Sequence, residues 1–233
     1  MSIKQHVELL DFTLLQAKLI LLLTGHGQSE TNASNCFTGL LDPPLTALGR
    51  DEAVALGDFL LERYSPGTFT RAYTSPLQRA SVTLDLVLAR LPPACRPPVT
   101  IAPALNERDY GHMNGRSKEE CKKEYGGEPP WRRGFSEIPP GGESLEMTAH
   151  RVSAYYEEEL KPRLLRGERL LVVSHGNTLR GLIMALEGLG ADEIKKVELG
   201  YTATRTYRLD GSGNIMERGV FAVDGIEGGW NKS

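Results

Sequence analysis

Residues 18–27 read KLILLLTGHG, a short apolar run that ends in Gly-His-Gly. Residues 169–177 read RLLVVSHGN and repeat the same order of apolar run, histidine and glycine. Apolar runs of this length predict strands that are buried on both faces, as in a parallel sheet. Ligands of open α/β sheets bind beyond the carboxyl ends of the strands. The two runs therefore predict neighbouring strands of a parallel sheet, and they place His26 and His175 at one candidate site.

Strand and helix patterns alternate along the whole chain, which predicts a three-layer α/β sandwich with a mainly parallel central sheet. Thr46 is a good N-cap for a helix over 46–64. Residues 106–140 are polar and rich in Gly and Pro, which is typical of a lid or binding excursion. The tail from Asp210 is Gly-rich, and we expect it to be mobile. The other expected elements are strands over 70–74, 99–101 and 203–209 and helices over 76–91, 117–125, 143–165, 178–186 and 192–197.

Composition excludes several classes of protein. The 233 residues are 40% hydrophobic and 24% charged, which is ordinary for a globular domain, and the net charge is -3. A pI near 6.0 argues against a nucleic-acid-binding protein, for which a pI above about 9 is usual. No run reaches the roughly 18 to 20 apolar residues of a membrane helix, and no signal peptide is recognisable. The three cysteines are far apart and predict no disulfide framework, so we expect a cytoplasmic protein.

The polar residues near the two histidines indicate which kinds of catalytic chemistry the site can carry out. Two histidines in matched contexts are harder to explain as simple strand caps than one. The chain contains no H-E-x-x-H metal motif, no G-x-S-x-G, no Walker A sequence and no G-x-G-x-x-G. Guanidinium groups match phosphate oxygens, and neutral histidine is a nucleophile near working pH. The sequence therefore predicts a phosphorylated small-molecule substrate and phosphohistidine chemistry without a metal, supported by the cations Arg79, Lys118, Arg132, Arg133 and Arg180.

Several motifs in order resemble the histidine phosphatase superfamily and, within it, the cofactor-dependent phosphoglycerate mutases. The resemblance covers about residues 18–210, most of the chain. It implies a single phosphoglycerate mutase-like domain over 1–233, with an N-terminal extension over 1–17 and a Gly-rich tail over 211–233. The motifs are HGQSETN at 26–32, CFTG at 36–39, TSPLQRA at 74–80, LNERDYG at 105–111, WRR at 131–133, GESL at 142–145 and SHGNTLR at 174–180.

The resemblance also implies a role for each matched residue. His26 would be the phosphorylated nucleophile, His175 would stabilise the transferring phosphoryl group, Arg79 would hold its oxygens, and Glu107 would be the general acid and base. It implies 2,3-bisphosphoglycerate as the phosphoryl primer, no metal, and a homodimer. The substrate-binding set that it implies is Ser29, Asn32, Thr38, Gly39, Tyr110, Lys118, Arg132, Arg133 and Asn177.

The most consequential departure from the family pattern is Gly25, which stands where the family has the arginine of R-H-G. Loss of one such donor typically costs about 10²- to 10³-fold in rate. The segment Tyr201-Thr202-Ala203-Thr204 also replaces the usual T-G-x-P. Three interpretations stay open: a phosphoglycerate mutase weakened by Gly25, a histidine-type phosphatase acting on small phosphorylated metabolites, and a phosphate-binding pseudoenzyme or scaffold.

Overall fold

The two apolar runs form neighbouring strands in the computed structural model, which describes residues 19–221 and 229–232. Strands β1 (Leu19–Gly25) and β4 (Leu170–Ser174) pair in parallel, with Gly25 opposite Ser174. The residues that follow both strands therefore emerge at the same edge of the sheet. The extension expected over residues 1–17 lies outside the described residues.

The sheet has seven strands in the order β3-β2-β4-β1-β5-β6-β7. Strands β2 (Arg71–Thr74) and β3 (Val99–Ile101) continue the parallel half on one side of β4. On the other side, β5 (Thr204–Leu209) runs antiparallel to β1. The site-bearing half is thus parallel as expected, while the far half is antiparallel.

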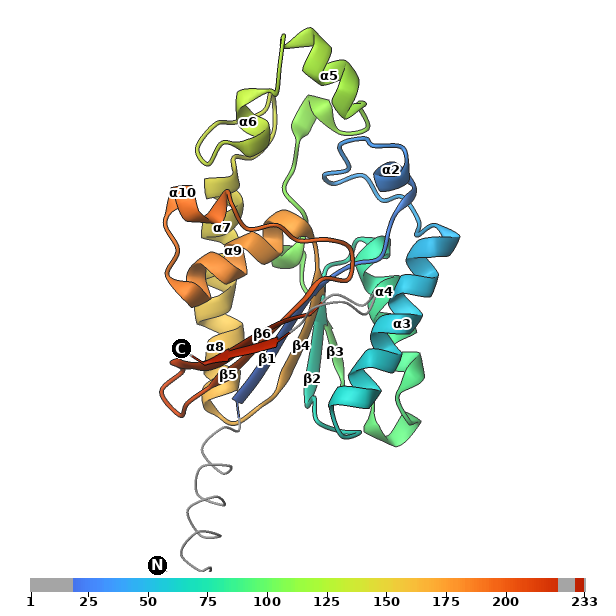
Figure 1. Ribbon diagram of the computed structural model, residues 1–233, viewed down its shortest axis with the longest axis vertical. Coiled ribbons are helices and arrows are strands. Elements are labelled where there is room, and N and C mark those ends of the chain that lie inside the picture. Colours follow the sequence, from blue (N-terminus) through green and yellow to red (C-terminus); the bar gives the residue numbers. More distant parts are fainter. Residues whose placement is uncertain (1–18, 222–228, 233) are drawn as a thin grey trace, which may run out of the picture.

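Helices cover both faces of the sheet, which confirms the three-layer architecture. Helices α3 (Ala47–Arg63) and α4 (Gln78–Arg90) lie on one face (Figure 1). The other face carries α7 (Leu145–Tyr155), α8 (Lys161–Leu165) and α9 (Gly176–Glu187). Successive side chains of a strand point to opposite faces. Leu22 accordingly packs in the core under α3 and α4, and Leu21 and Leu23 pack in the core under α7, α8 and α9.

Local signals explain several element boundaries. Thr46 caps α3 by accepting a hydrogen bond from the Gly49 backbone N–H at 3.0 Å, as its sequence position predicts. The helix expected over 143–165 is a succession of α7, a π-helical segment (Tyr156–Leu160) and α8. The short elements are α10 (Ala191–Ile194) and the 3₁₀ segments η1 (Pro93–Cys95), η2 (Pro103–Leu105) and η3 (Gly111–Met113).

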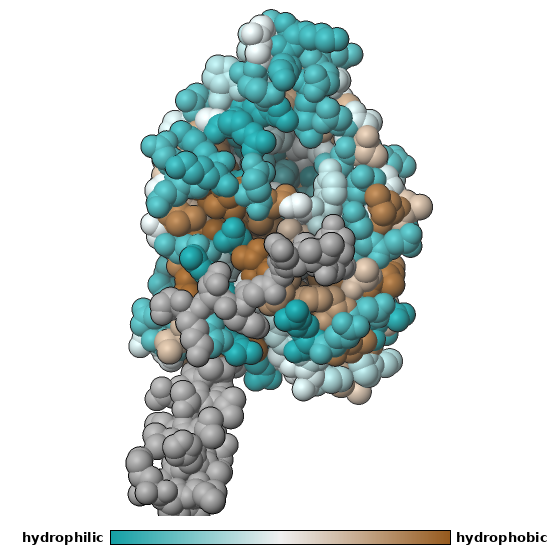
Figure 2. Space-filling model, in the orientation of Figure 1, coloured by the Kyte–Doolittle hydropathy of each residue, from teal (hydrophilic) through white to brown (hydrophobic). Residues whose placement is uncertain are grey.

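The polar excursion lies beyond the carboxyl edge of the sheet. It contains α5 (Lys118–Glu124) and α6 (Pro130–Arg133), and α2 (Glu30–Ala33) stands on the opposite side of the same opening (Figure 1). A buried cluster of Phe37, Met113, Cys121 and Trp131 holds this region together. Hydrophilic residues dominate its outer surface in the view of Figure 2. No helix within the described ranges is long and apolar enough to cross a membrane.

The expectation of a mobile tail is wrong for residues 215–221. Strand β6 (Ile215–Phe221) pairs antiparallel with β5, and β7 (Gly229–Lys232) pairs with β6. A tight turn makes this possible, because Asp210 Oδ1 accepts hydrogen bonds from the backbone N–H groups of Ser212 and Asn214, both about 2.8–2.9 Å long. Gly213 supplies the left-handed conformation of the turn, with φ +86°. The glycines thus form a hairpin rather than a loose end.

Candidate active site

The two histidines meet at the carboxyl edge of the parallel strands. The β1–β4 register sets His26 beside His175, and the His26 backbone N–H donates to Ser174 O at 3.0 Å. Their ring centroids lie 5.0 Å apart at an interplanar angle of 63°. Both side chains are buried. The structure therefore brings together the pair that the repeated sequence pattern predicted.

His26 has the protonation state of a nucleophile. Its Nδ1 lies 2.6 Å from Gly27 O. A carbonyl oxygen can only accept, so Nδ1 carries the proton and Nε2 keeps its lone pair. Burial, and then the charge of Arg79, lower the pKa of His26 to about 3. The imidazole is thus neutral at ordinary pH, with Nε2 as its nucleophilic atom.

Ser75, which belongs to the TSPLQRA motif and had no role assigned from the sequence, fixes His175. Ser75 Oγ lies 2.7 Å from His175 Nε2 and accepts from the Leu77 backbone N–H at 3.3 Å. The Ser75 hydroxyl can donate to Nε2 or accept from it, so this contact fixes the position of the ring and not its tautomer. The Nδ1 of His175 is buried and has no partner among the described residues. Burial and Arg79 also hold the pKa of His175 well below its usual value.

Arg79 brings a buried positive charge to the histidine pair. It lies in the first turn of α4 and is 1% exposed. Its terminal nitrogens donate to the carbonyl oxygens of Leu41 at 2.7 Å and Gly39 at 2.8 Å. Its Nε is buried without a partner in the described part of the chain. The guanidinium is therefore held in place while part of its donor capacity is unused.

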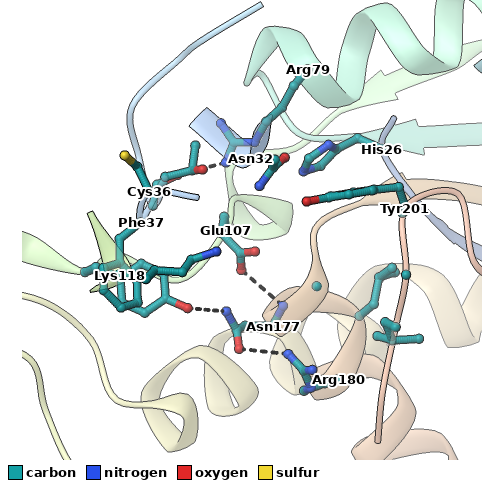
Figure 3. Close-up of a pocket in the computed structure, with 18 residues that line it drawn as sticks. His26, Asn32, Cys36, Phe37, Arg79, Glu107, Lys118, Asn177, Arg180 and Tyr201 are labelled. Carbon is teal, nitrogen blue, oxygen red and sulfur yellow. Dashed lines mark hydrogen bonds between the residues drawn. The ribbon is translucent and has the colours of Figure 1, made fainter. Parts of the chain in front are cut away.

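Glu107 faces the same pocket as His26 (Figure 3). Its Oε1 accepts from the backbone N–H groups of Arg108 at 2.8 Å and Asn177 at 3.2 Å. Asn177 belongs to the first turn of α9, whose partial positive charge favours a carboxylate at this place. These bonds fix the carboxylate through one oxygen and leave Oε2 for proton transfer.

Ser29 does not line the pocket, although we expected it among the substrate-binding residues. It is the N-cap of α2, fully buried, and its Oγ donates to Asn32 Oδ1 at 2.7 Å. The Ser29 backbone N–H donates to the same oxygen at 3.2 Å. Because Asn32 Oδ1 is occupied twice, its amide NH₂ is the group left for a ligand, and Asn32 does line the pocket. Ser29 thus orients Asn32.

The opposite wall carries the other predicted binding residues. The Asn177 side-chain amide donates to the Tyr110 hydroxyl at 3.0 Å. Lys118 Nζ lies 5.9 Å from the Phe37 ring centroid, and burial, followed by Arg132, lowers its pKa. Thr38 and Gly39 complete this wall. Gly39 has φ +49°, and a Cβ there would lie 1.9 Å from Asn114 Oδ1, so only glycine fits.

Arg132 and Arg133 line a second pocket that joins the first. Phe37, Tyr110, Lys118, Asn177 and Arg180 line both pockets. Both arginines are paired with surface carboxylates: Arg132 bonds to Glu128, and Arg133 bonds to Glu198 at 3.2 Å. The two pockets form one cationic groove with His26 at its inner end, and His175 is buried behind it.

Comparison with known proteins identifies the family to which the chain belongs. Residues 21–220 match the Histidine phosphatase superfamily (branch 1). The chain belongs to this superfamily. It is 45% identical over 201 residues to a 2,3-bisphosphoglycerate-dependent phosphoglycerate mutase of Rhodopseudomonas palustris, covering 85% of this chain and 96% of that protein. A mutase of the same description from Nitrobacter hamburgensis is 46% identical over the same shares of the two chains.

Solved structures of phosphatases share the histidine phosphatase fold. An alpha-ribazole phosphatase from Shigella flexneri matches with a TM-score of 0.69 at 25% identity, covering 84% of this chain and 98% of that chain. A mycobacterial glucosyl-3-phosphoglycerate phosphatase matches with a TM-score of 0.70 at 24% identity, covering 81% and 92%. The superfamily match ends at residue 220, so it includes nearly all of β6, beyond the limit near residue 210 that the motifs suggested.

Several residues of this superfamily site had no role assigned from the sequence. Arg180 was noted as a cation, and it lines both pockets and donates to Asn177 Oδ1 at 3.3 Å. Ser75 holds His175. Tyr201 lines the pocket beside His26 (Figure 3), and its only signal was the departure from T-G-x-P. Lys195 and Glu198 line the second pocket and carried no motif signal.

Proposed function

We propose that this protein is a 2,3-bisphosphoglycerate-dependent phosphoglycerate mutase that interconverts 3-phosphoglycerate and 2-phosphoglycerate through a phosphohistidine at His26. The observation that carries the proposal is the buried, neutral His26, whose Nδ1 proton is held by Gly27 O and whose Nε2 is left as the nucleophile. Relatives between 41% and 46% identical carry this activity in their names. The cationic groove supports a small substrate with more than one anionic group.

His26 and Glu107 divide the chemistry. A hydroxyl oxygen of the bound glycerate attacks the phosphoryl group on His26, so that an O–P bond forms as the N–P bond breaks. Glu107 takes the proton of that hydroxyl. In the return step, His26 Nε2 attacks the other phosphoryl group, and Glu107 gives the proton to the departing oxygen. The relay is required because neither hydroxyl can attack its neighbour's phosphate in line, and the surrounding donors stabilise charge on the transferring group.

The residues present fit an anionic primer. Arg79 Nε and His175 Nδ1 are buried polar atoms without partners among the described residues, and each such orphaned group costs about 1–3 kcal/mol. An anion beside His26 would accept from Arg79 Nε, and from His175 Nδ1 in the tautomer that carries the proton there. When bound, 2,3-bisphosphoglycerate supplies the phosphoryl group that loads His26. Lys118, Arg132 and Arg133 would hold its other anionic groups along the groove.

Intact-mass measurement after incubation with 2,3-bisphosphoglycerate tests the proposal directly. We expect the wild-type protein to gain the mass of one phosphoryl group and His26→Ala to gain none. His150→Ala is the matched control, because His150 is exposed and lies outside the two joined pockets. It should gain the group as the wild type does. A protein that binds phosphoglycerate without this adduct is the phosphate-binding scaffold instead.

A second assay separates mutase from phosphatase. Formation of 2-phosphoglycerate, coupled to enolase, is followed together with release of free phosphate, with and without the primer. We expect isomerisation to be primer-dependent and faster than phosphate release. Phosphate release that far outruns isomerisation would identify a histidine-type phosphatase. The homodimer and the cytoplasmic location remain predictions from the sequence.

A further inference from the structure

Gly25, the last residue of β1, has no side chain, and the loop over residues 200–203 covers it. A Cβ at Gly25 would lie 3.4 Å from Gly200 O and 3.6 Å from Thr202 N. The Gly25 backbone N–H donates to Ala203 O at 3.3 Å, and the Thr202 backbone N–H donates to His26 O at 3.4 Å. The covering loop is thus hydrogen-bonded to the very residues that carry the nucleophile.

The loop is held in an unfavourable conformation. Thr202 has φ +50°, a left-handed value that a β-branched residue rarely adopts. It is 3% exposed, its Oγ1 donates to Tyr201 O at 2.8 Å, and its carbonyl accepts from Thr24 Oγ1 at 3.3 Å. Such strain persists only where the surroundings fix it, and it is typical of functional sites. The consequence here is a fixed direction for the neighbouring Tyr201.

The side chain of Tyr201 points into the pocket. Its ring reaches across the opening, with the phenol oxygen on the side of His26 and Asn32 (Figure 3). Tyr201 is 43% exposed, so its phenol is open to a ligand that enters the pocket. Burial, with Glu52 as a lesser cause, raises the pKa of Tyr201. The phenol is therefore protonated at ordinary pH and able to donate.

We propose that the Tyr201 phenol donates a hydrogen bond to the phosphoryl group held at His26, the group that an arginine at residue 25 would otherwise contact. This inference rests on the proposed phosphohistidine function and adds a catalytic residue to it. A phenol supplies one donor and no charge, so it replaces only part of what an arginine would provide. Its hydrogen bond should matter most when charge develops on the transferring group.

The variant Tyr201→Phe removes the donor and keeps the ring. We expect kcat of the mutase reaction to fall by about 10- to 100-fold, as for loss of a hydrogen bond to a charged group, with a smaller change in KM. The dissociation constant for inorganic phosphate, measured by titration calorimetry, should rise. Tyr125→Phe is the matched control: Tyr125 is 41% exposed and lies outside both joined pockets, and this variant should change neither quantity.

A double variant tests the link to Gly25. Gly25→Arg should restore more turnover in the Tyr201→Phe background than it adds to the wild type, because the two donors serve the same group. Equal kcat and equal phosphate affinity in Tyr201→Phe and wild type would overturn the inference. The inference would also be overturned if Tyr201→Ala lost activity while Tyr201→Phe kept it, because the ring would then act through packing and not through its hydroxyl. Failure of the proposed function is separate, since it appears as a wild type without phosphohistidine, and phosphate affinity still decides the role of Tyr201.

Discussion

Gly25 stands where the family pattern has an arginine, so the site has no side chain at this position. The backbone has room for one, since a Cβ there meets only ordinary contacts at 3.4 and 3.6 Å. Gly25→Arg should raise kcat by about 10²-fold through stabilisation of the transferring group. KM should change much less, because Lys118, Arg132 and Arg133 would hold the rest of the substrate. Steady-state kinetics of the two proteins measure this, and equal kcat values would mean that the site does not need a guanidinium at residue 25.

The buried histidines predict a loss of stability in acid. Burial and Arg79 lower the pKa of His26 from 6.5 to about 3, and the pKa of His175 is also well below 6.5. The unfolded protein therefore binds more protons than the folded protein below pH 6.5. The free energy of unfolding has its full value above that pH and falls as the pH decreases. His26 should cost about 1.4 kcal/mol at about pH 5.5, and His175 adds a cost of the same sign. Urea unfolding of wild type and His26→Gln at about pH 7.5 and about pH 5.5 tests this, and the variant should lose about 1.4 kcal/mol less. Identical losses would contradict it.

At the scale of elements, the first turn of α3 packs against the loop that carries His26. A Cβ on Gly49 would lie 2.1 Å from Gln28 O, and a Cβ on Gly27 would lie 2.1 Å from Gly49 O. Alanine normally favours a helix over glycine by about 1 kcal/mol. Here we expect Gly49→Ala to destabilise the protein by about 1–3 kcal/mol and to lower kcat, because the His26 loop must move. Gly211→Ala, with no atom within 4 Å of its Cβ, is the control for urea unfolding. A more stable Gly49→Ala protein would refute this contact.

The elements that sequence could predict are those with local signals. The Thr46 cap and the apolar runs before His26 and His175 carry their own hydrogen-bonding and burial patterns, so these parts of the fold were confirmed. Strand β6 was missed because Met216 and Val220 are exposed, whereas its pairing with β5 and the burial of Phe221 exist only in the folded sheet. The capping role of Ser29 and the position of Tyr201 depend on how loops pack in three dimensions. No spacing rule contains that information.

The whole molecule assembles the site from every layer. His26 and His175 come from the sheet, Arg79 from the helices on one face, Asn177 from those on the other, and Lys118 from the excursion. Only the carboxyl edge of the parallel strands is reached by all of these parts. The long excursion therefore supplies one wall of the site, which the sheet alone does not provide.

The edge of the sheet also bears on assembly. Strand β3 pairs only with β2 among the described strands, and its Val99 and Ile101 are 42% and 59% exposed. An apolar edge strand is a template for pairing with another chain. We expect a homodimer through two β3 edges, with a light-scattering mass twice the 25.6 kDa of the chain. Ile101→Lys should return the mass to that of one chain, because the charge would be buried at the interface. Ile138→Lys is the matched control, since Ile138 is 58% exposed but lies in the excursion, away from β3. A wild-type mass near 25.6 kDa at micromolar concentration would contradict the dimer.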